Sequence, residues 1–358
     1  MNRCFRQVNA TRHRLLLVLQ AGFGLESLMP NCISLTVHCS QFPAQVRADL
    51  LQSLRSRQIN HKFLYDSVKQ AQKWLALHEA YSPSRTDPNG AEIYDLSLQA
   101  AAAACAEVAL VHVIGLGCGG GQKETRLLQW LKQAGKAVAY TPCDVSTAIV
   151  LAAQQAALST VSATDCHPIV CDLATCDELA ALLDSLATGG AARLITFFGM
   201  MPNSEPDLIL PRLAGIVRRQ DIMLLSANLA PGPDYEAGVR RVLPLYDNGL
   251  TSDWLLTFLF DLGVAPADGE LRFSVCDCPA GSGLKRIEAN FHFVQSRAMQ
   301  VAGEQIEFQA GDLVRLFFSY RYTPDRIQLL LGPYGLSVLK QWITRSEEEG
   351  IFLCRRTA

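Results

Sequence analysis

Hydrophobic positions in the central part of the chain form short continuous runs separated by helical stretches. Five of these runs predict strands, at residues 111–115, 136–144, 167–173, 193–199 and 221–229. Because the apolar residues are continuous rather than alternating, we expect strands buried on both faces. Amphipathic segments lie between them and end at glycines, as helices often do. The alternation predicts a parallel, doubly wound sheet, and the fold class is α/β.

The pattern changes on both sides of this region. Residues 42–77 have the spacing of amphipathic helices, and turn residues at 81–90 separate them from an alanine-rich helix expected at 96–109. After Pro231, a helical stretch is followed by runs that predict antiparallel strands in a second, α+β unit. Residues 323–358 have the pattern of a helix followed by a strand hairpin.

Composition and charge limit the class of protein. The chain of 358 residues is 49% hydrophobic and 18% charged, which is typical of a globular protein. Its net charge of -2 lacks the basic footprint of a general nucleic-acid binder. No apolar segment is long enough to span a membrane. We therefore expect a cytoplasmic monomer without nucleic-acid or membrane partners.

The twelve cysteines form no CxxC pair, and several lie inside apolar runs. This pattern favours reduced, structural thiols in a cytosolic protein. The close pair Cys276 and Cys278 has no histidine cluster beside it, so the sequence predicts no metal site.

A glycine-rich loop follows the first predicted strand and opens a helix, an arrangement that lets a nucleotide approach the backbone closely. Gly115, Gly117 and Gly120 have the GxGxxG spacing of dinucleotide sites. Gly115, Gly117 and Gly119 equally have the GxGxG spacing of S-adenosylmethionine (SAM) sites. The loop alone therefore leaves NAD and SAM open, whereas the absence of a P-loop lysine disfavours phosphate transfer.

Acidic residues at the next two strand ends favour SAM. Asp144 closes the second strand, where a carboxylate binds the ribose hydroxyls of either cofactor. Asp172 and Leu173 close the third strand, where an acid and an apolar residue suit the adenine amine and ring. The alternative is that each aspartate caps the helix after it.

Several short motifs occur along the chain in the same order as in a known enzyme family. The chain has LYDS at 64–67, YSPSRTD at 81–87, a lysine after the glycine loop, TPCDVS at 141–146, FFGMMPNSEP at 197–206 and LYDN at 245–248. From about Phe63 onward it resembles the histidine-specific Nα-methyltransferases of ergothioneine biosynthesis, whose relatives include tryptophan and dimethylallyltryptophan N-methyltransferases. The resemblance implies a class I SAM methyltransferase fold, with a Rossmann-like sheet and a second substrate-binding domain.

The resemblance also implies roles for individual residues. Those expected to hold SAM are Gly115, Gly117, Gly119, Lys123, Asp144, Asp172 and Leu173. Those expected to bind the amino and carboxylate groups of an amino acid are Tyr65, Tyr81, Asn203 and Tyr246. No general base is evident, and Tyr65 and Asp247 are the two candidates.

Two departures from the family pattern concern the site. The acid that precedes the family's glycine loop is Gly115 here. In the family's TExSxK segment the glutamate and serine meet the imidazole; this chain retains Ser319 but has Phe317 in place of the glutamate. An apolar wall in place of an acceptor favours an apolar or aromatic amino acid over histidine. A non-catalytic SAM-binding protein and an NAD-dependent oxidoreductase are the alternatives.

These patterns divide the chain into five expected segments. They are a flexible or non-native leader at 1–41, a helical part of the substrate domain at 42–85, a SAM-binding domain at 86–235, the antiparallel part of the substrate domain at 236–322, and a helix with a strand hairpin at 323–358 that completes the sheet. The leader has arginines before an apolar stretch, but glycines interrupt that stretch and no convincing cleavage site follows.

Overall fold

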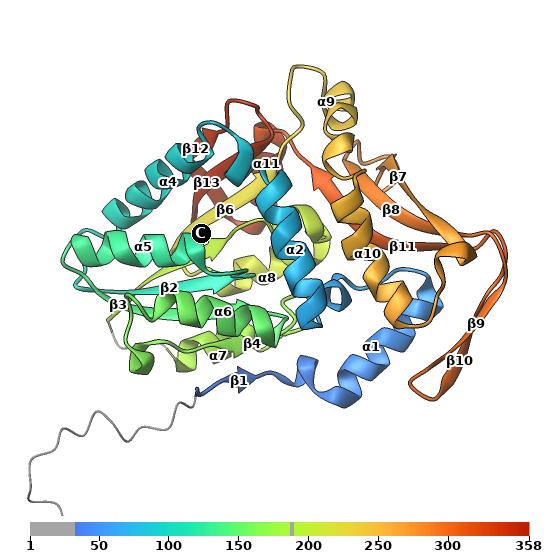
Figure 1. The fold of residues 1–358 in the computed structure, drawn as a ribbon. Helices are drawn as coiled ribbons and strands as arrows, with labels where there is room; N and C mark the ends of the chain where they lie inside the picture. Colours follow the sequence, from blue (N-terminus) through green and yellow to red (C-terminus); the bar gives the residue numbers. More distant parts are fainter. Residues whose placement is uncertain (1–32, 187–189, 358) are drawn as a thin grey trace, which may run out of the picture. The chain divides into compact units, whose positions relative to one another are not determined.

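The computed structural model describes residues 33–186 and 190–357, so most of the expected leader lies outside the described residues. The fold described below is that of the compact unit Leu35–Ala358. Its main sheet has eight strands in the order β1-β4-β3-β2-β5-β6-β13-β12 (Figure 1). Their bounds are β1 Thr36–Val37, β2 Leu110–Leu116, β3 Ala137–Asp144, β4 Ile169–Val170, β5 Ala192–Phe197, β6 Ile222–Asn228, β12 Leu336–Ile343 and β13 Glu349–Arg356.

The strand directions confirm the predicted doubly wound α/β sheet. Strands β1 to β6 pair in parallel, whereas β13 is antiparallel to both of its neighbours, β6 and β12. The strand order reverses between β2 and β5, since β3 and β4 follow on one side and β6 on the other. Ligands of such sheets bind outside the carboxyl ends of the strands at this reversal.

Both faces of the sheet are covered, which explains the continuous hydrophobic runs. Successive residues of β2 point to opposite faces: Val113 packs in one core cluster and Ile114 in the other. The first face is covered by α4 (Gly90–Ala104), α5 (Gln122–Gln133) and α6 (Thr147–Ala157). The second is covered by α7 (Leu179–Ser185), α8 (Pro206–Ile216) and α11 (Pro324–Leu331).

A separate antiparallel unit lies beside the main sheet (Figure 1). It contains the three-stranded sheet β11-β8-β7 and the hairpin β9-β10. The bounds are β7 Gly269–Asp277, β8 Lys285–Phe293, β9 Arg297–Val301, β10 Glu304–Phe308 and β11 Leu313–Arg321. The remaining α-helices are α1 Pro43–Ser56, α2 Val68–Tyr81, α3 Pro83–Thr86, α9 Tyr235–Arg241 and α10 Gly249–Asp261.

The N-terminal helices belong to the core of this antiparallel unit. Leu54 of α1, Trp254 of α10 and Phe291 of β8 share one buried cluster. Helix α2 packs against α10 (Figure 1). No helix among the described residues is long and apolar enough to cross a membrane.

Three predicted elements differ from the structure. The alanine-rich helix α4 begins at Gly90 instead of residue 96 and ends at Ala104 instead of residue 109. The helical stretch at 42–77 is interrupted after α1, where Arg57 has a left-handed backbone, and resumes at α2 with a capping box at Ser67. The third predicted strand shortens to the two residues of β4, because the chain turns at Asp172.

Candidate cofactor and substrate site

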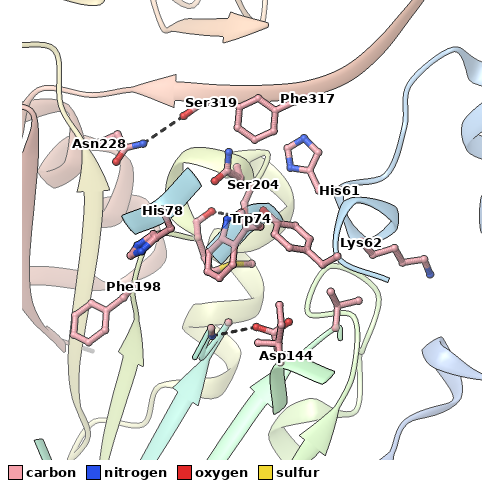
Figure 2. Close-up of a pocket in the computed structure, with 18 of the residues that line it drawn as sticks. His61, Lys62, Trp74, His78, Asp144, Phe198, Ser204, Asn228, Phe317 and Ser319 are labelled. Carbon is pink, nitrogen blue, oxygen red and sulfur yellow. Dashed lines mark hydrogen bonds between the residues drawn. The ribbon is translucent and has the colours of Figure 1, made fainter. Parts of the chain in front are cut away.

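A cavity of about 1040 Å³ lies at the carboxyl ends of the parallel strands and extends to α2 and β11. Figure 2 shows Asp144 on one side of it, Phe317 and His61 on the other, and Trp74 between them. Its lining includes twelve residues that the sequence singled out: Tyr65, Tyr81, Gly117, Gly119, Lys123, Asp144, Asp172, Leu173, Asn203, Tyr246, Phe317 and Ser319. Gly115 and Asp247 are outside the lining, and Asp247 is exposed to solvent.

The glycine loop turns at three left-handed residues. Gly117, Gly119 and Gly121 have φ angles of 68°, 51° and 72°. A Cβ atom on Gly117 would lie 2.3 Å from Cγ of Met200, so a side chain here would have to displace that methionine. Gly115 is instead a buried residue of β2. The turn is thus made by the second, fourth and sixth residues after Gly115.

Glu124 occupies the space beside Gly115. A Cβ atom on Gly115 would lie 3.3 Å from Cγ of Glu124 and 3.2 Å from Cβ of Cys118. Glu124 is 3% exposed, and its Oε1 accepts a 2.8 Å hydrogen bond from the Thr196 hydroxyl. Burial raises the pKa of the Glu124 carboxyl. A carboxyl group therefore reaches the cavity from the first turn of α5, beside the strand position where the resemblance implied an acid.

Asp144 ends β3 with its carboxylate facing the loop. Its Oδ2 accepts a hydrogen bond from the Gly119 N–H at 3.3 Å, and its Oδ1 accepts one from the Ser146 N–H at 3.2 Å. Ser146, not Asp144, caps α6, so the helix-capping alternative is not realised here. Burial raises the pKa of Asp144 to about 6, although these backbone donors act in the opposite direction.

Asp172 presents an oxygen that lacks a hydrogen-bond donor. Its Oδ1 accepts from the Ala174 N–H at 2.9 Å, whereas its buried Oδ2 has no hydrogen-bond partner among the described residues and lies 3.8 Å from Lys62 Nζ. Helix α7 is preceded by Glu178, so Asp172 does not cap it. The Oδ2 atom is ion-paired with Lys62 but accepts no hydrogen bond, and the amino group of an adenine would supply a donor beside Leu173. The site fits the adenosine part of SAM.

Two consecutive hydrogen bonds link Lys123 to the last strand, β13. Its Nζ donates to the Tyr94 hydroxyl at 2.8 Å, and that hydroxyl donates to Glu349 Oε1 at 2.5 Å. The Lys123 cation also lies 4.1 Å from the centre of the Tyr94 ring. Burial lowers the pKa of Lys123. The lysine is thus fixed at the cavity wall by α4 and β13.

A polar cluster surrounds the Tyr246 hydroxyl. Its oxygen accepts hydrogen bonds from Arg321 Nη2 at 2.8 Å and Asn228 Nδ2 at 3.1 Å, and it lies 2.9 Å from Ser319 Oγ. Because two donors already point at the oxygen, the phenol proton remains available to Ser319 or to a ligand. Arg321 is only 2% exposed and brings a buried positive charge. This end of the cavity suits a carboxylate.

An aromatic wall adjoins the polar cluster. Phe317 of β11 is 6% exposed and stacks on His61, with ring centroids 5.2 Å apart and planes at 17°. The indole of Trp254 meets the same ring edge to face at 5.7 Å. Burial and the nearby Arg315 lower the pKa of His61 to about 3, so this imidazole is neutral. Phe317 therefore sits in an uncharged aromatic layer.

Tyr65 and Asn203 approach the middle of the cavity. The Tyr65 ring packs against Trp74 at 5.6 Å and Trp254 at 5.5 Å. Burial, and then the charge of Asp144, raise the pKa of Tyr65, so its phenol is protonated at neutral pH. Asn203 lies in a short 3-10 helix after β5, and its Nδ2 donates to the Phe318 carbonyl at 2.8 Å. Tyr81 lines the cavity at the end of α2.

Sequence reasoning missed several lining residues. Asn228 ends β6, so the strand-end rule that indicated Asp144 would also have found it. Arg321 ends β11 and falls at the lysine of the TExSxK segment that drew attention to Phe317 and Ser319, so its place in that motif was the signal that could have found it. His61 and Trp74 carry no sequence signal, because they reach the cavity only through the packing of the N-terminal helices.

Solved structures of methyltransferases share low overall similarity with this chain. The CcbJ methyltransferase from Streptomyces caelestis is 13% identical with a TM-score of 0.37, covering 75% of this chain and 96% of its own. SAM-bound CalS10, an amino pentose methyltransferase from Micromonospora echinaspora, is 12% identical with a TM-score of 0.38, covering 78% and 97%. A putative methyltransferase from Thermobifida fusca is 11% identical with a TM-score of 0.44, covering 85% and 97%. No curated protein matches the sequence.

The glycine turn and the strand-end carboxylates form a cofactor site of the kind expected in a SAM-dependent methyltransferase, and the family match shows that this is the class of the protein. Residues 46–237 and 281–356 match the family of histidine-specific, SAM-dependent methyltransferases. These segments make up well over half of the sequence, so the chain belongs to this family. The family resemblance and the predicted cofactor SAM are confirmed, and the family implies a small-molecule methyl acceptor.

Proposed function

We propose that the protein transfers the methyl group of SAM to the α-amine of an amino acid, or a close derivative, with an apolar or aromatic side chain. The observation that carries this proposal is the buried Phe317 ring, which stacks on a neutral His61. If a histidine substrate placed its imidazole against this ring, residue 317 would offer no carboxylate to accept a hydrogen bond from it. A histidine would therefore lose a hydrogen bond in binding, whereas an aromatic side chain would gain a stacking surface.

The polar cluster would bind the substrate carboxylate. Arg321 supplies the charge, and the Tyr246 proton is positioned to donate. Asn203, fixed to the Phe318 carbonyl, would complete the contact with the main-chain groups of the substrate. With the carboxylate here and the side chain against Phe317, the amine would face the cofactor half of the cavity.

SAM would be held by the glycine loop, by Asp144 at its ribose and by Asp172 with Leu173 at its adenine. When bound, it supplies an electrophilic sulfonium methyl group. The protein's part is to align the amine nitrogen with the methyl carbon and to exclude water. A new N–C bond forms as the S–C bond breaks, and the amine proton is released.

The amine must be neutral to react, and burial among aromatic rings favours its neutral form. Tyr65 is a hydrogen-bond donor at neutral pH because its pKa is raised. We therefore propose that Tyr65 orients the acceptor or cofactor and does not remove the proton. Asp247 is exposed outside the lining and has no part in this proposal.

The test combines calorimetric titration with product analysis. In the titration SAM should bind and NAD should not. When the protein is incubated with SAM and each of the twenty amino acids in turn, mass spectrometry should show a methylated apolar or aromatic amino acid. Binding of SAM without methylation of any of them would instead favour a SAM-binding protein that has lost catalysis. A methylated histidine as the main product would contradict the proposed specificity.

A further inference from the structure

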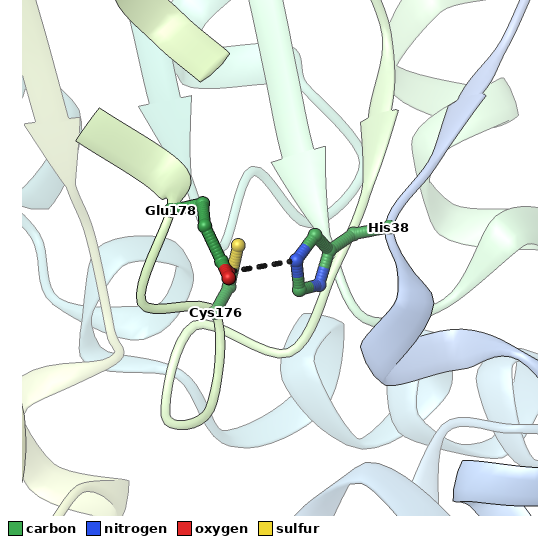
Figure 3. Close-up of side chains that lie close together, drawn as sticks. All are labelled: His38, Cys176 and Glu178. Atoms are coloured by element: carbon green, nitrogen blue, oxygen red, sulfur yellow. Dashed lines mark hydrogen bonds and ion pairs between the residues drawn. The ribbon is translucent and has the colours of Figure 1, made fainter. Parts of the chain in front are cut away.

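Three potential metal ligands meet at the edge of the main sheet, next to the turn that begins at Asp172. They are His38, Cys176 and Glu178, and one donor atom of each lies within 4.8 Å of the others (Figure 3). His38 and Cys176 are separated by more than a hundred residues in sequence, so only the fold brings them together. They form the one such group found among the described residues.

The backbone holds both sides of this group in place. His38 follows β1, which pairs with β4 in register Val37 with Val170, and the His38 N–H donates to the Val170 carbonyl at 2.9 Å. On the other side, the Cys176 N–H donates to the Asp172 carbonyl at 2.9 Å. Cys176 is 3% exposed, and the His38 side chain is 13% exposed. Backbone hydrogen bonds therefore fix both of the segments that carry these two ligands.

The donor atoms are close enough to share one ion. His38 Nε2 lies 3.3 Å from Glu178 Oε2, and the donor atoms of all three residues lie within 4.8 Å of one another. Zinc bonds of about 2.0–2.1 Å at a tetrahedral angle place N and O ligands about 3.3 Å apart, so the histidine–glutamate distance is that of two zinc ligands. Glu178 precedes α7 without capping it, so its carboxylate is free of that role.

We propose that His38, Cys176 and Glu178 bind one Zn²⁺ ion. One nitrogen, one thiolate and one carboxylate are the donor types that zinc takes in proteins. The fourth position lies toward solvent, where Cys39 is exposed beside His38 Nε2. Sequence spacing gave no sign of this site because its ligands come from two distant segments without a CxxC pair.

The second ring nitrogen of His38 is held by Ser40. His38 Nδ1 accepts a hydrogen bond from the Ser40 N–H at 3.1 Å and lies 2.9 Å from Ser40 Oγ, which in turn accepts a hydrogen bond from the Asp172 N–H at 3.0 Å. For zinc to bind Nε2 the ring proton must move to Nδ1, so the bond from the Ser40 N–H is exchanged for one that Nδ1 donates to Ser40 Oγ. The Cys176 thiol releases its proton to solvent as the S–Zn bond forms.

The position of the site gives it a role. Ser40 and Cys176 both contact the backbone of Asp172, whose carboxylate lines the SAM cavity. A bound ion would join the segment after β1 to the loop after β4 and so stiffen the adenine end of that cavity. Zinc should therefore raise the thermal stability of the full chain, since it binds the folded state.

Metal titration of the full chain tests the proposal. After treatment with a chelator, the protein should bind one Zn²⁺ in competition with a chromophoric chelator, and Co²⁺ should give a thiolate-to-cobalt charge-transfer band. Cys176→Ser should abolish that band, and Glu178→Ala should weaken zinc binding by about 10-fold or more. Glu178 is exposed, so its variant should fold normally even if the cysteine variant does not.

Two control variants separate this site from other thiols. Cys166→Ser removes a buried thiol that belongs to a different core cluster from Cys176 and should leave the cobalt band intact. The double variant Cys4→Ser/Cys32→Ser removes thiols outside the described residues and should also leave it intact. Absence of metal binding, or a cobalt band and zinc affinity that Cys176→Ser and Glu178→Ala both leave unchanged, would overturn the proposal.

Discussion

Asp144 is the residue through which pH should act on cofactor binding. Its pKa is raised to about 6 by burial, so the carboxyl is ionised above that pH and protonated below it. Only the carboxylate can accept both ribose hydroxyls. We expect the affinity for SAM to fall as the pH is lowered from about 7.5 to about 5, measured by calorimetry.

Variants of Asp144 sharpen this prediction. Asp144→Ala should abolish SAM binding, and Asp144→Asn should bind weakly with a flat pH profile. Asp165→Ala, which removes an exposed carboxylate before β4, is the control and should behave like the unmodified protein. If Asp144→Asn keeps the full pH dependence, another group is responsible, and Glu124 is the nearest candidate because burial also raises its pKa.

Gly115 and Glu124 should be coupled, because they compete for one buried space. Gly115→Glu adds a second carboxyl group where a Cβ alone would already lie 3.3 Å from Cγ of Glu124. We expect it to destabilise the protein by about 2 kcal/mol or more in chemical denaturation and to weaken SAM binding. The double variant Gly115→Glu/Glu124→Ala should recover part of both losses. Additive losses would show that the two positions are independent.

In the glycine turn, the strain of a left-handed backbone can be separated from the effect of close neighbours. Gly117 and Gly135 both have left-handed φ angles, of 68° and 76°. Only Gly117 has a close neighbour, Met200, and nothing lies within 4 Å of a Cβ on Gly135. Alanine at either position should cost about 1 kcal/mol or more in stability because of the backbone strain.

Cofactor binding should distinguish these two alanine variants. Gly117→Ala should weaken SAM binding in calorimetry, because its methyl group displaces Met200 and strains the left-handed turn. Gly135→Ala, which lies between α5 and β3, should retain it. Equal affinities for SAM in the two variants would contradict the assignment of Gly117 to the cofactor cradle.

Helices and strands could be predicted from the sequence where a single hydrophobic pattern dominates. Continuous apolar runs predicted the central strands, since burial on both faces leaves little room for polar residues. The start of α4 was misplaced because Gly90 is a poor helix former that tertiary packing tolerates. The β9-β10 hairpin was hidden in a longer polar-apolar alternation, which does not reveal where a turn falls.

At the scale of the whole molecule, the parallel main sheet and the antiparallel unit together form one cavity. The main sheet supplies the strand ends, and the antiparallel unit supplies Phe317, Ser319 and Arg321. The sequence could indicate residues within recognisable motifs, such as Asp144. It could not indicate the layer of His61 on Phe317, because these residues are distant in sequence and meet only after the two units fold together.

Phe317 is the position at which a substitution should change specificity. Phe317→Glu restores the acceptor of the histidine-specific enzymes and should raise the affinity for histidine by about 10-fold or more, measured by calorimetry in the presence of S-adenosylhomocysteine. Phe317→Leu keeps an apolar side chain and is the matched control, so it should not gain histidine binding. Equal histidine affinity in the two variants would place the specificity elsewhere in the cavity.

The most direct measurement is a competition between acceptors. The protein is incubated with SAM and equal concentrations of histidine, tryptophan, phenylalanine and leucine, and the initial rates of methylated products are followed by mass spectrometry. The ratio of rates reports the ratio of kcat/KM values. We predict α-N-methylation of an apolar or aromatic acceptor at least about 100-fold faster than that of histidine. Histidine methylated at a comparable or higher rate would contradict the proposed function.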